Sequence, residues 1–133
     1  MKEYCLRLKK GDDLKREIEE LCKIEGIDTA CVISSVGSLI AIDIRLAKAQ
    51  DKLHIDDGFE ILSLNGTISK GKAHLHIAVS DDKGDCLGGH LLEGTLVDTT
   101  CELIILALDA YSSKRTYDEK TGYDEIVFER KDI

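Results

Sequence analysis

The stretch around which the chain is organised is KAHLHIAVSDDKGDCLGGHLL, residues Lys72–Leu92. It contains three of the four histidines: His74, His76 and His90. Side chains alternate between the two faces of a strand, so the imidazoles of His74 and His76 are expected to point the same way. The intervening SDDKGD is typical of a turn, which would return CLGGHLL alongside the first strand and bring His90 near the other two histidines.

Three converging imidazoles are the ligand set of catalytic zinc sites that leave one position open. The spacing leaves two interpretations open: a metal site held by His74, His76 and His90, or histidines that are hydrogen-bonded within a sheet. Cys86 is a further candidate ligand, although no ligand spacing supports it. Gly88 and Gly89 match no phosphate-binding motif, and they indicate a bulge or a close approach of the backbone.

Length and composition indicate an ordinary globular chain, with one domain expected over residues 1–133. Of the 133 residues, 43% are hydrophobic and 33% are charged, and there is no proline. The formal net charge is -8, which argues against a direct nucleic-acid surface because such surfaces neutralise phosphates with Lys and Arg.

The compartment follows from the cysteines and from the absence of long apolar runs. The five cysteines form no C-x-x-C pair, so buried free thiols in a reducing compartment are expected. We find no secretory signal and no apolar segment long enough to cross a bilayer. The sequence therefore predicts a cytoplasmic protein without a membrane partner.

Hydrophobic periodicity predicts one helix and a series of strands. The helix covers 13–25, with Asp12 or Asp13 as N-cap and Gly26 at its end. Gly37 and Ser38 are expected to break a strand that is buried on both faces, and 47–57 and 112–122 are expected to be loops or turns. The predicted strands are 1–8, 27–36, 39–46, 59–69, 73–80, 86–92, 95–111 and 123–130. These elements predict an α+β fold: a mostly antiparallel, strongly curved or closed sheet with one main helix.

Other charged or polar residues are weaker candidates for the site. Arg45, late in a strand, could line a pocket, but decoration of an exposed edge is favoured. His54 lacks a partner at ligand spacing and is interpreted as a surface histidine. Glu60 and Glu102 interrupt apolar strands, where a carboxylate either faces solvent or orients a ligand and acts as an acid or base.

The segments GFEILSLNGTIS, HLHIAVSD, GGHLLEG and TTCELII, in this order, resemble the PPC domain, named for its occurrence in plants and prokaryotes. The resemblance implies an α+β fold, homotrimers and a metal ion bound by histidines that match His74, His76 and His90. The fold of this domain family is also similar to that of acetolactate decarboxylase, a metal enzyme with three histidine ligands. In plants the domain follows an AT-hook, which this sequence lacks. The plant partner-contact motif corresponds here to Gly58, Phe59, Glu60, Ile61 and Leu62, without its arginine.

Two functional hypotheses follow. The first is a homotrimer with a divalent metal site, zinc by preference, that binds a small ligand or substrate, with Glu60 or Glu102 as a candidate acid or base. The second is a DNA-associated regulatory module that acts through protein partners and in which the histidines are structural.

Overall fold

A computed structural model describes residues 1–132, so the last residue of the predicted 1–133 domain lies outside the described part. Strands make up 64% of the structure, and the described residues contain a single α-helix. The elements in chain order are β1 (Lys2–Lys9), α1 (Leu14–Ile24), β2 (Thr29–Arg45), β3 (Lys52–Ile55), β4 (Phe59–Ser69), β5 (Lys72–Ser80), β6 (Cys86–Leu91), β7 (Leu96–Ala107), β8 (Tyr111–Asp118) and β9 (Tyr123–Arg130).

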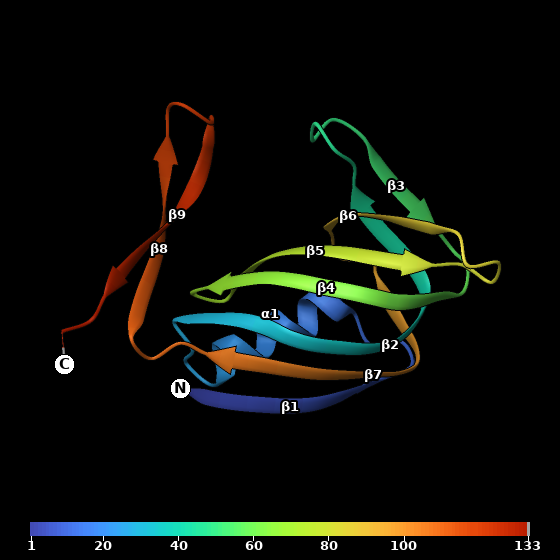
Figure 1. The fold of residues 1–133 in the computed structure, drawn as a ribbon, viewed down its shortest axis with the longest axis horizontal. Helices are drawn as coiled ribbons and strands as arrows, with labels where there is room; N and C mark the ends of the chain where they lie inside the picture. The colour runs from blue at the N-terminus through green and yellow to red at the C-terminus, as the bar shows by residue number, and fades with distance from the viewer. Residues whose placement is uncertain (133) are drawn as a thin grey trace.

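Seven strands form the main sheet, in the order β1-β7-β2-β4-β5-β6, with β3 paired to β2 (Figure 1). Every pairing is antiparallel. The end of β2 also pairs with β6, so the sheet curls back and closes a ring of β2, β4, β5 and β6. The predicted single domain with a mostly antiparallel sheet and one helix is confirmed; α+β is a coarse description, because the structure is mainly β.

Helix α1 begins and ends close to the predicted positions. Asp13 is the N-cap and accepts a hydrogen bond from the backbone N–H of Arg16 at 3.1 Å. Leu14, Ile18 and Cys22 recur at helical spacing and are buried against the sheet. The charged residues of the helix also contact β5, since Glu19 accepts the backbone N–H of Ala73, near the start of that strand, at 2.9 Å.

The core is built from the inner face of the curled sheet and the apolar face of α1. Among its fully buried side chains are Leu39, Ile42, Ile44, Ile68, Leu75, Leu91 and Ile105. Cys22 and Cys101 belong to it as small apolar side chains, and burial raises the pKa of the Cys22 thiol to about 11. Cys5 and Cys86 are exposed, so the expectation of buried thiols holds for only part of the set.

Strand β2 corrects the prediction of two strands broken at Gly37. It runs unbroken for 17 residues, and Gly37 is paired within it, opposite Cys101 of β7. A Cβ at this position would collide with the backbone carbonyl of Thr100. The strand is also not buried on both faces, since Ile33 and Val36 are 55% and 59% exposed.

The two segments predicted as loops or turns each contain a strand. The segment 47–57 includes β3, which pairs with the end of β2. The segment 112–122 contains most of β8, which forms a separate hairpin with β9 and stands away from the sheet (Figure 1). Strand β3 alternates but is only 4 residues long, and β8 has few apolar residues, so neither was predicted as a strand.

The hairpin β8–β9 is attached to the sheet by hydroxyl groups at its base. The side chain of Ser113 is buried and lies 2.8 Å from the hydroxyls of both Thr29 and Ser69. Its backbone N–H donates to Asp28 Oδ1 at 2.7 Å. Although burial acts in the opposite direction, the hydrogen bonds from Ser113 and Thr29 hold the pKa of Asp28 below its usual value.

Residues 1–132 include no helix with the length and apolar character that crossing a bilayer requires.

Candidate metal centre

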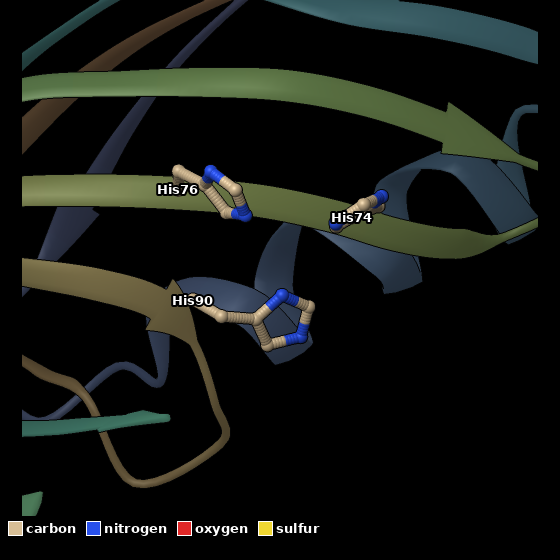
Figure 2. A group of neighbouring side chains, drawn as sticks. All are labelled: His74, His76 and His90. Atoms are coloured by element: carbon tan, nitrogen blue, oxygen red, sulfur yellow. The ribbon is translucent and has the colours of Figure 1, made fainter. Parts of the chain in front are cut away.

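Two neighbouring strands bring the three predicted histidines together. His76 on β5 lies directly opposite His90 on β6, and His74 is two residues away on the same face of β5. Figure 2 shows the three side chains facing a common space. Their ring centroids lie 5.1–5.8 Å apart, and each ring offers a nitrogen within 4.8 Å of the other two. The predicted convergence is therefore present within one chain.

Two glycines allow β6 to pair with β5 on one side and β2 on the other. Gly88 faces the backbone carbonyl of Ile77 on β5, so closely that a Cβ would collide with it. On the other side, a Cβ at Gly89 would lie 2.6 Å from the carbonyl oxygen of Arg45 on β2. The pair lets β6 lie between two strands at close range and sets the position of His90.

The electrostatic surroundings keep two of the imidazoles neutral. Burial, followed by repulsion from Arg45, lowers the pKa of His90 to about 4. Partial burial of the ring, followed by the positive charge of Arg115, lowers the pKa of His74 as well. Neutral imidazole is the form that binds a metal ion, so these shifts favour the metal-binding form of His74 and His90 at neutral pH.

The residues fit a divalent ion in a second respect. His90 Nδ1 is buried and has no hydrogen-bond partner within residues 1–132. Buried ring nitrogens are normally hydrogen-bonded or bound to a metal. Zinc bound tetrahedrally at about 2.0–2.1 Å places its nitrogens roughly 3.3 Å apart. His74 and His76 are exposed, and rotation of their side chains can close the remaining gap.

Three other candidate ligands or catalytic residues lie away from this cluster. Glu60 is opposite Ser80, four residues along β5 from His76, and Glu102 is opposite Arg7 on β1. Both carboxylates are exposed. Cys86 is also opposite Ser80, at the far end of β6 from His90, so its proposed role as a fourth ligand is wrong.

The predicted partner-contact segment is divided by strand alternation. Phe59 and Ile61 are buried in the core, at 5% and 7% exposure. Gly58, Glu60 and Leu62 are exposed, and Leu62 is 54% exposed. Only these three residues of the segment present side-chain or backbone surface to a partner.

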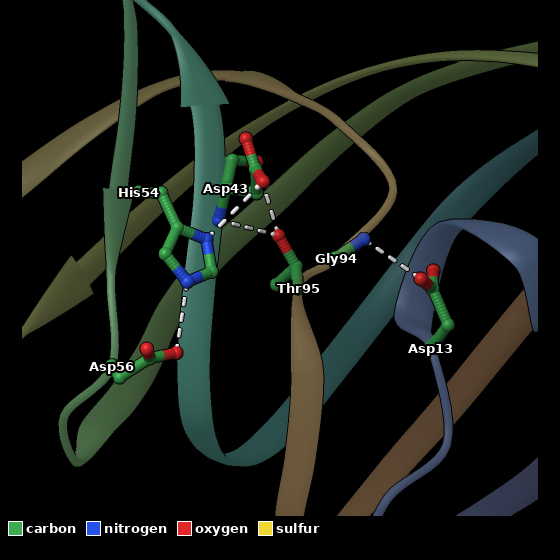
Figure 3. Close-up of polar contacts among 6 residues, drawn as sticks. All are labelled: Asp13, Asp43, His54, Asp56, Gly94 and Thr95. Carbon is green, nitrogen blue, oxygen red and sulfur yellow. Dashed lines mark hydrogen bonds and ion pairs between the residues drawn. The ribbon is translucent and has the colours of Figure 1, made fainter.

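His54 lies apart from the histidine cluster, as expected, but it does have partners (Figure 3). Its Nε2 is 2.8 Å from Asp56 Oδ1, and its Nδ1 is 3.2 Å from Asp43 Oδ2. Hydrogen bonds to Asp56 and Asp43 raise the pKa of His54. This histidine therefore links β3 to β2 rather than binding a metal.

A cavity of about 550 Å³ opens beside His74 and His90. Arg45 lines it and is half-buried, which corrects its interpretation as decoration of an exposed edge. Sequence reasoning missed Lys15 of α1 and Arg115 of β8, which also line the cavity. The sequence of β8, YSSKRTYD, shows no apolar alternation, and the only available signal was Gly122 in the short connection to the alternating residues of β9.

Comparison with known proteins identifies the family. The sequence model of the Plants and Prokaryotes Conserved (PCC) domain matches residues 1–109. The chain belongs to this family. The predicted PPC resemblance is thereby confirmed, and the matched region of the PCC domain includes all three histidines of the cluster. The hairpin β8–β9 follows the matched region.

Individual relatives of this PCC-domain chain cover nearly all of it. It is 34% identical to a hypothetical protein from Salmonella enterica, with a TM-score of 0.93 over 97% of this chain and 94% of that one. It is 32% identical to a protein from Archaeoglobus fulgidus described as metal-containing, with a TM-score of 0.79 over 96% and 94% of the two chains. The bifunctional protein GlmU of Synechococcus sp. strain JA-3-3Ab is 38% identical over 127 residues; the chain spans 20% of that protein's length.

Proposed function

We propose that this PCC-domain protein is a metal protein in which His74, His76 and His90 hold one divalent ion, zinc by preference, for binding a small ligand or substrate. The observation that carries the proposal is the convergence of three imidazole nitrogens within 4.8 Å of one another. The unpartnered, buried Nδ1 of His90 adds to it. The likeness to the metal-containing protein of Archaeoglobus fulgidus agrees with it.

The chain's own residues define what such a centre does. Three histidine ligands would leave coordination positions open toward the cavity, and an ion held there would polarise a carbonyl group or lower the pKa of a bound water. His76 and His90 are held by direct strand pairing, so their positions are set by the sheet rather than by a loop. The cavity beside them is within the size range of small-molecule sites.

The test is the metal content of tag-free protein by elemental analysis, with a matched control. We expect about one ion per chain in the wild type and none in the His74/His76/His90 triple alanine variant. His54→Ala serves as the control, because it removes the fourth histidine of the chain without touching the cluster. Wild-type protein without stoichiometric zinc, manganese, iron or nickel would refute the proposal.

We further propose a homotrimer that works in the cytoplasm. Apolar side chains on β2, β4 and β7 are exposed: Ile33, Val36, Leu62 and Ile104. Such a surface is favoured at subunit contacts, and it includes Leu62 of the predicted contact segment Gly58–Leu62. Sedimentation should give a trimer for the wild type and a smaller species for Leu62→Asp. The five free cysteines suit a reducing compartment.

A catalytic role for Glu60 or Glu102 would require an assembly, since neither carboxylate belongs to the cluster of its own chain. Once a substrate is known, Glu60→Gln and Glu102→Gln test this role directly. A loss of kcat with unchanged metal content supports it, and unchanged kcat in both variants removes both residues from the mechanism.

The second candidate is a DNA-associated module that acts through protein partners. The net charge of -8 opposes direct contact with phosphates, so any such role would depend on a partner that supplies the basic surface. A gel shift at low salt with the isolated protein should therefore be blank. A salt-sensitive shift would favour this candidate over a small-molecule site.

A further inference from the structure

The cavity beside the histidines has an unusual charge for this protein. The chain carries a net charge of -8, yet basic side chains outnumber acidic ones around this cavity. The basic lining residues are Lys15, Lys23, Arg45, Lys72 and Arg115. The acidic ones are Glu19, Asp124 and Glu125. A basic pocket in an acidic chain indicates a ligand with negative charge.

The acidic residues do not neutralise the two arginines. Glu19 is paired with Lys15 at 3.0 Å and also accepts the backbone N–H of Ala73 at 2.9 Å, so its charge is balanced within the wall. Asp124 offers Arg115 its backbone carbonyl, at 3.2 Å from Nη1. Within residues 1–132, neither Arg45 nor Arg115 has a carboxylate oxygen within 4.0 Å.

Arg115, which lines the cavity, has an unused hydrogen-bond donor. Its Nη2 is buried and has no hydrogen-bond partner in the described part of the chain. A buried guanidinium nitrogen without a partner lowers stability unless a hydrogen-bond acceptor binds to it. The side chain comes from the hairpin β8–β9, and Ser113, two residues earlier, fixes the base of that hairpin to the sheet. The arginine is therefore positioned beside the histidines by a defined attachment.

We infer that Arg115, together with Arg45, binds the anionic group of a small ligand, a carboxylate or a phosphate, whose other end reaches the three-histidine centre. The inference rests on the proposed metal function and specifies the ligand class for it. Guanidinium groups bind both kinds of oxyanion through paired N–H donors, and partial shielding from water strengthens the contact. In this arrangement the sheet positions the three histidines, and the hairpin provides the arginine that binds the anionic group of the small molecule.

The test is calorimetric titration of the protein with three probes: succinate, inorganic phosphate and the neutral analogue succinamide. Binding of succinate or phosphate, with no binding of succinamide, is expected, and the stronger of the two anions identifies the group. Arg115→Gln should weaken anion binding about tenfold or more, because it removes a charged donor. Metal content should stay unchanged, since the histidines are untouched.

Lys114→Gln is the matched control. It removes one positive charge from the same strand, but Lys114 is exposed and paired with Glu129 at 3.5 Å, outside the cavity. Its anion affinity should equal that of the wild type. Should Arg115→Gln disorder the hairpin, Arg45→Gln on the sheet provides the second variant, with the same expected weakening.

The outcomes separate this inference from the proposed function. Wild-type affinity in both arginine variants, or equal binding of succinate and succinamide, would overturn the anion site whatever the metal content. A protein without stoichiometric metal that still binds an anion through Arg115 would refute the metal centre and leave the anion site standing.

Discussion

The main sheet and the hairpin β8–β9 are both antiparallel, but they are held together by different forces. The sheet closes on itself through the double pairing of β2 and encloses an apolar core. The hairpin is a separate two-stranded sheet whose aromatic side chains at Tyr117, Tyr123 and Phe128 are exposed. Its attachment depends on the buried hydroxyl of Ser113. A two-stranded hairpin is marginally stable alone, so this attachment determines its order.

The difference corresponds to a division of roles. The histidines need fixed positions, and they lie on paired strands of the closed sheet. Arg115 lies on the more weakly attached element and faces the same cavity. Elements with few buried apolar contacts open most easily, so we expect the hairpin to open before the sheet does.

The largest contrast should come from removing the same two methyl groups in the two regions. Val79 on β5 is fully buried, whereas Val127 on β9 is 38% exposed. Val79→Ala should lower the free energy of unfolding by about 2–3 kcal/mol, because it leaves a cavity in the core. Val127→Ala should cost under about 1 kcal/mol. Urea denaturation measures both, and equal losses would contradict the contrast.

A second test addresses the close approach of β6 to the backbones of its neighbouring strands. Gly89→Ala places a Cβ 2.6 Å from the Arg45 carbonyl oxygen and should cost about 1–3 kcal/mol, with a loss of metal affinity as His90 shifts. Gly58→Ala is the control, since a Cβ there has no atom within 4 Å. Denaturation and metal titration of both variants give the result. Wild-type metal affinity in Gly89→Ala would separate the glycines from the site.

One substitution can weaken the attachment of the hairpin without changing the core of the sheet. Ser113→Ala leaves the hydroxyls of Thr29 and Ser69 without their shared partner, at a cost of about 1–2 kcal/mol. Amide hydrogen exchange should speed up in β8 and β9 while the sheet keeps its protection. Ser112→Ala, one residue earlier, is the control. Uniform loss of protection over the whole chain would show that the two regions unfold as one unit.

The smallest effect is expected at the edge of the sheet, where His54 joins β3 to β2. Its folded-state pKa is raised by the carboxylates of Asp56 and Asp43. The contribution to stability is therefore fully present below the unfolded pKa of about 6.5, and it is lost as pH rises through the raised value. Exchange of the β3 amides should accelerate over that window, and His54→Gln should abolish the pH dependence. An NMR titration that placed this pKa at or below 6.5 would contradict the assignment.

Short-range patterns accounted for much of the fold and for the three-histidine cluster. The helix was predictable because Asp13 caps it and apolar residues recur every three or four positions. The histidines were predictable because strand alternation and one turn suffice to bring them together. The prediction was wrong for β8, since Arg115 and its neighbours carry charge on a strand with little burial, so apolar periodicity could not reveal it.

By itself, the sequence determined an antiparallel domain with one helix and a three-histidine hairpin, because these depend on contacts between residues close in the chain. Only the tertiary structure decided that β2 runs unbroken through Gly37 and pairs again with β6, since this follows from backbone approach between distant strands. The same holds for the cavity where Arg45 and Arg115 meet the histidines. The burial and the charge of this cavity depend on residues from α1, β2, β5, β6 and the hairpin together. Because these residues are far apart in the sequence, no local pattern could predict the cavity.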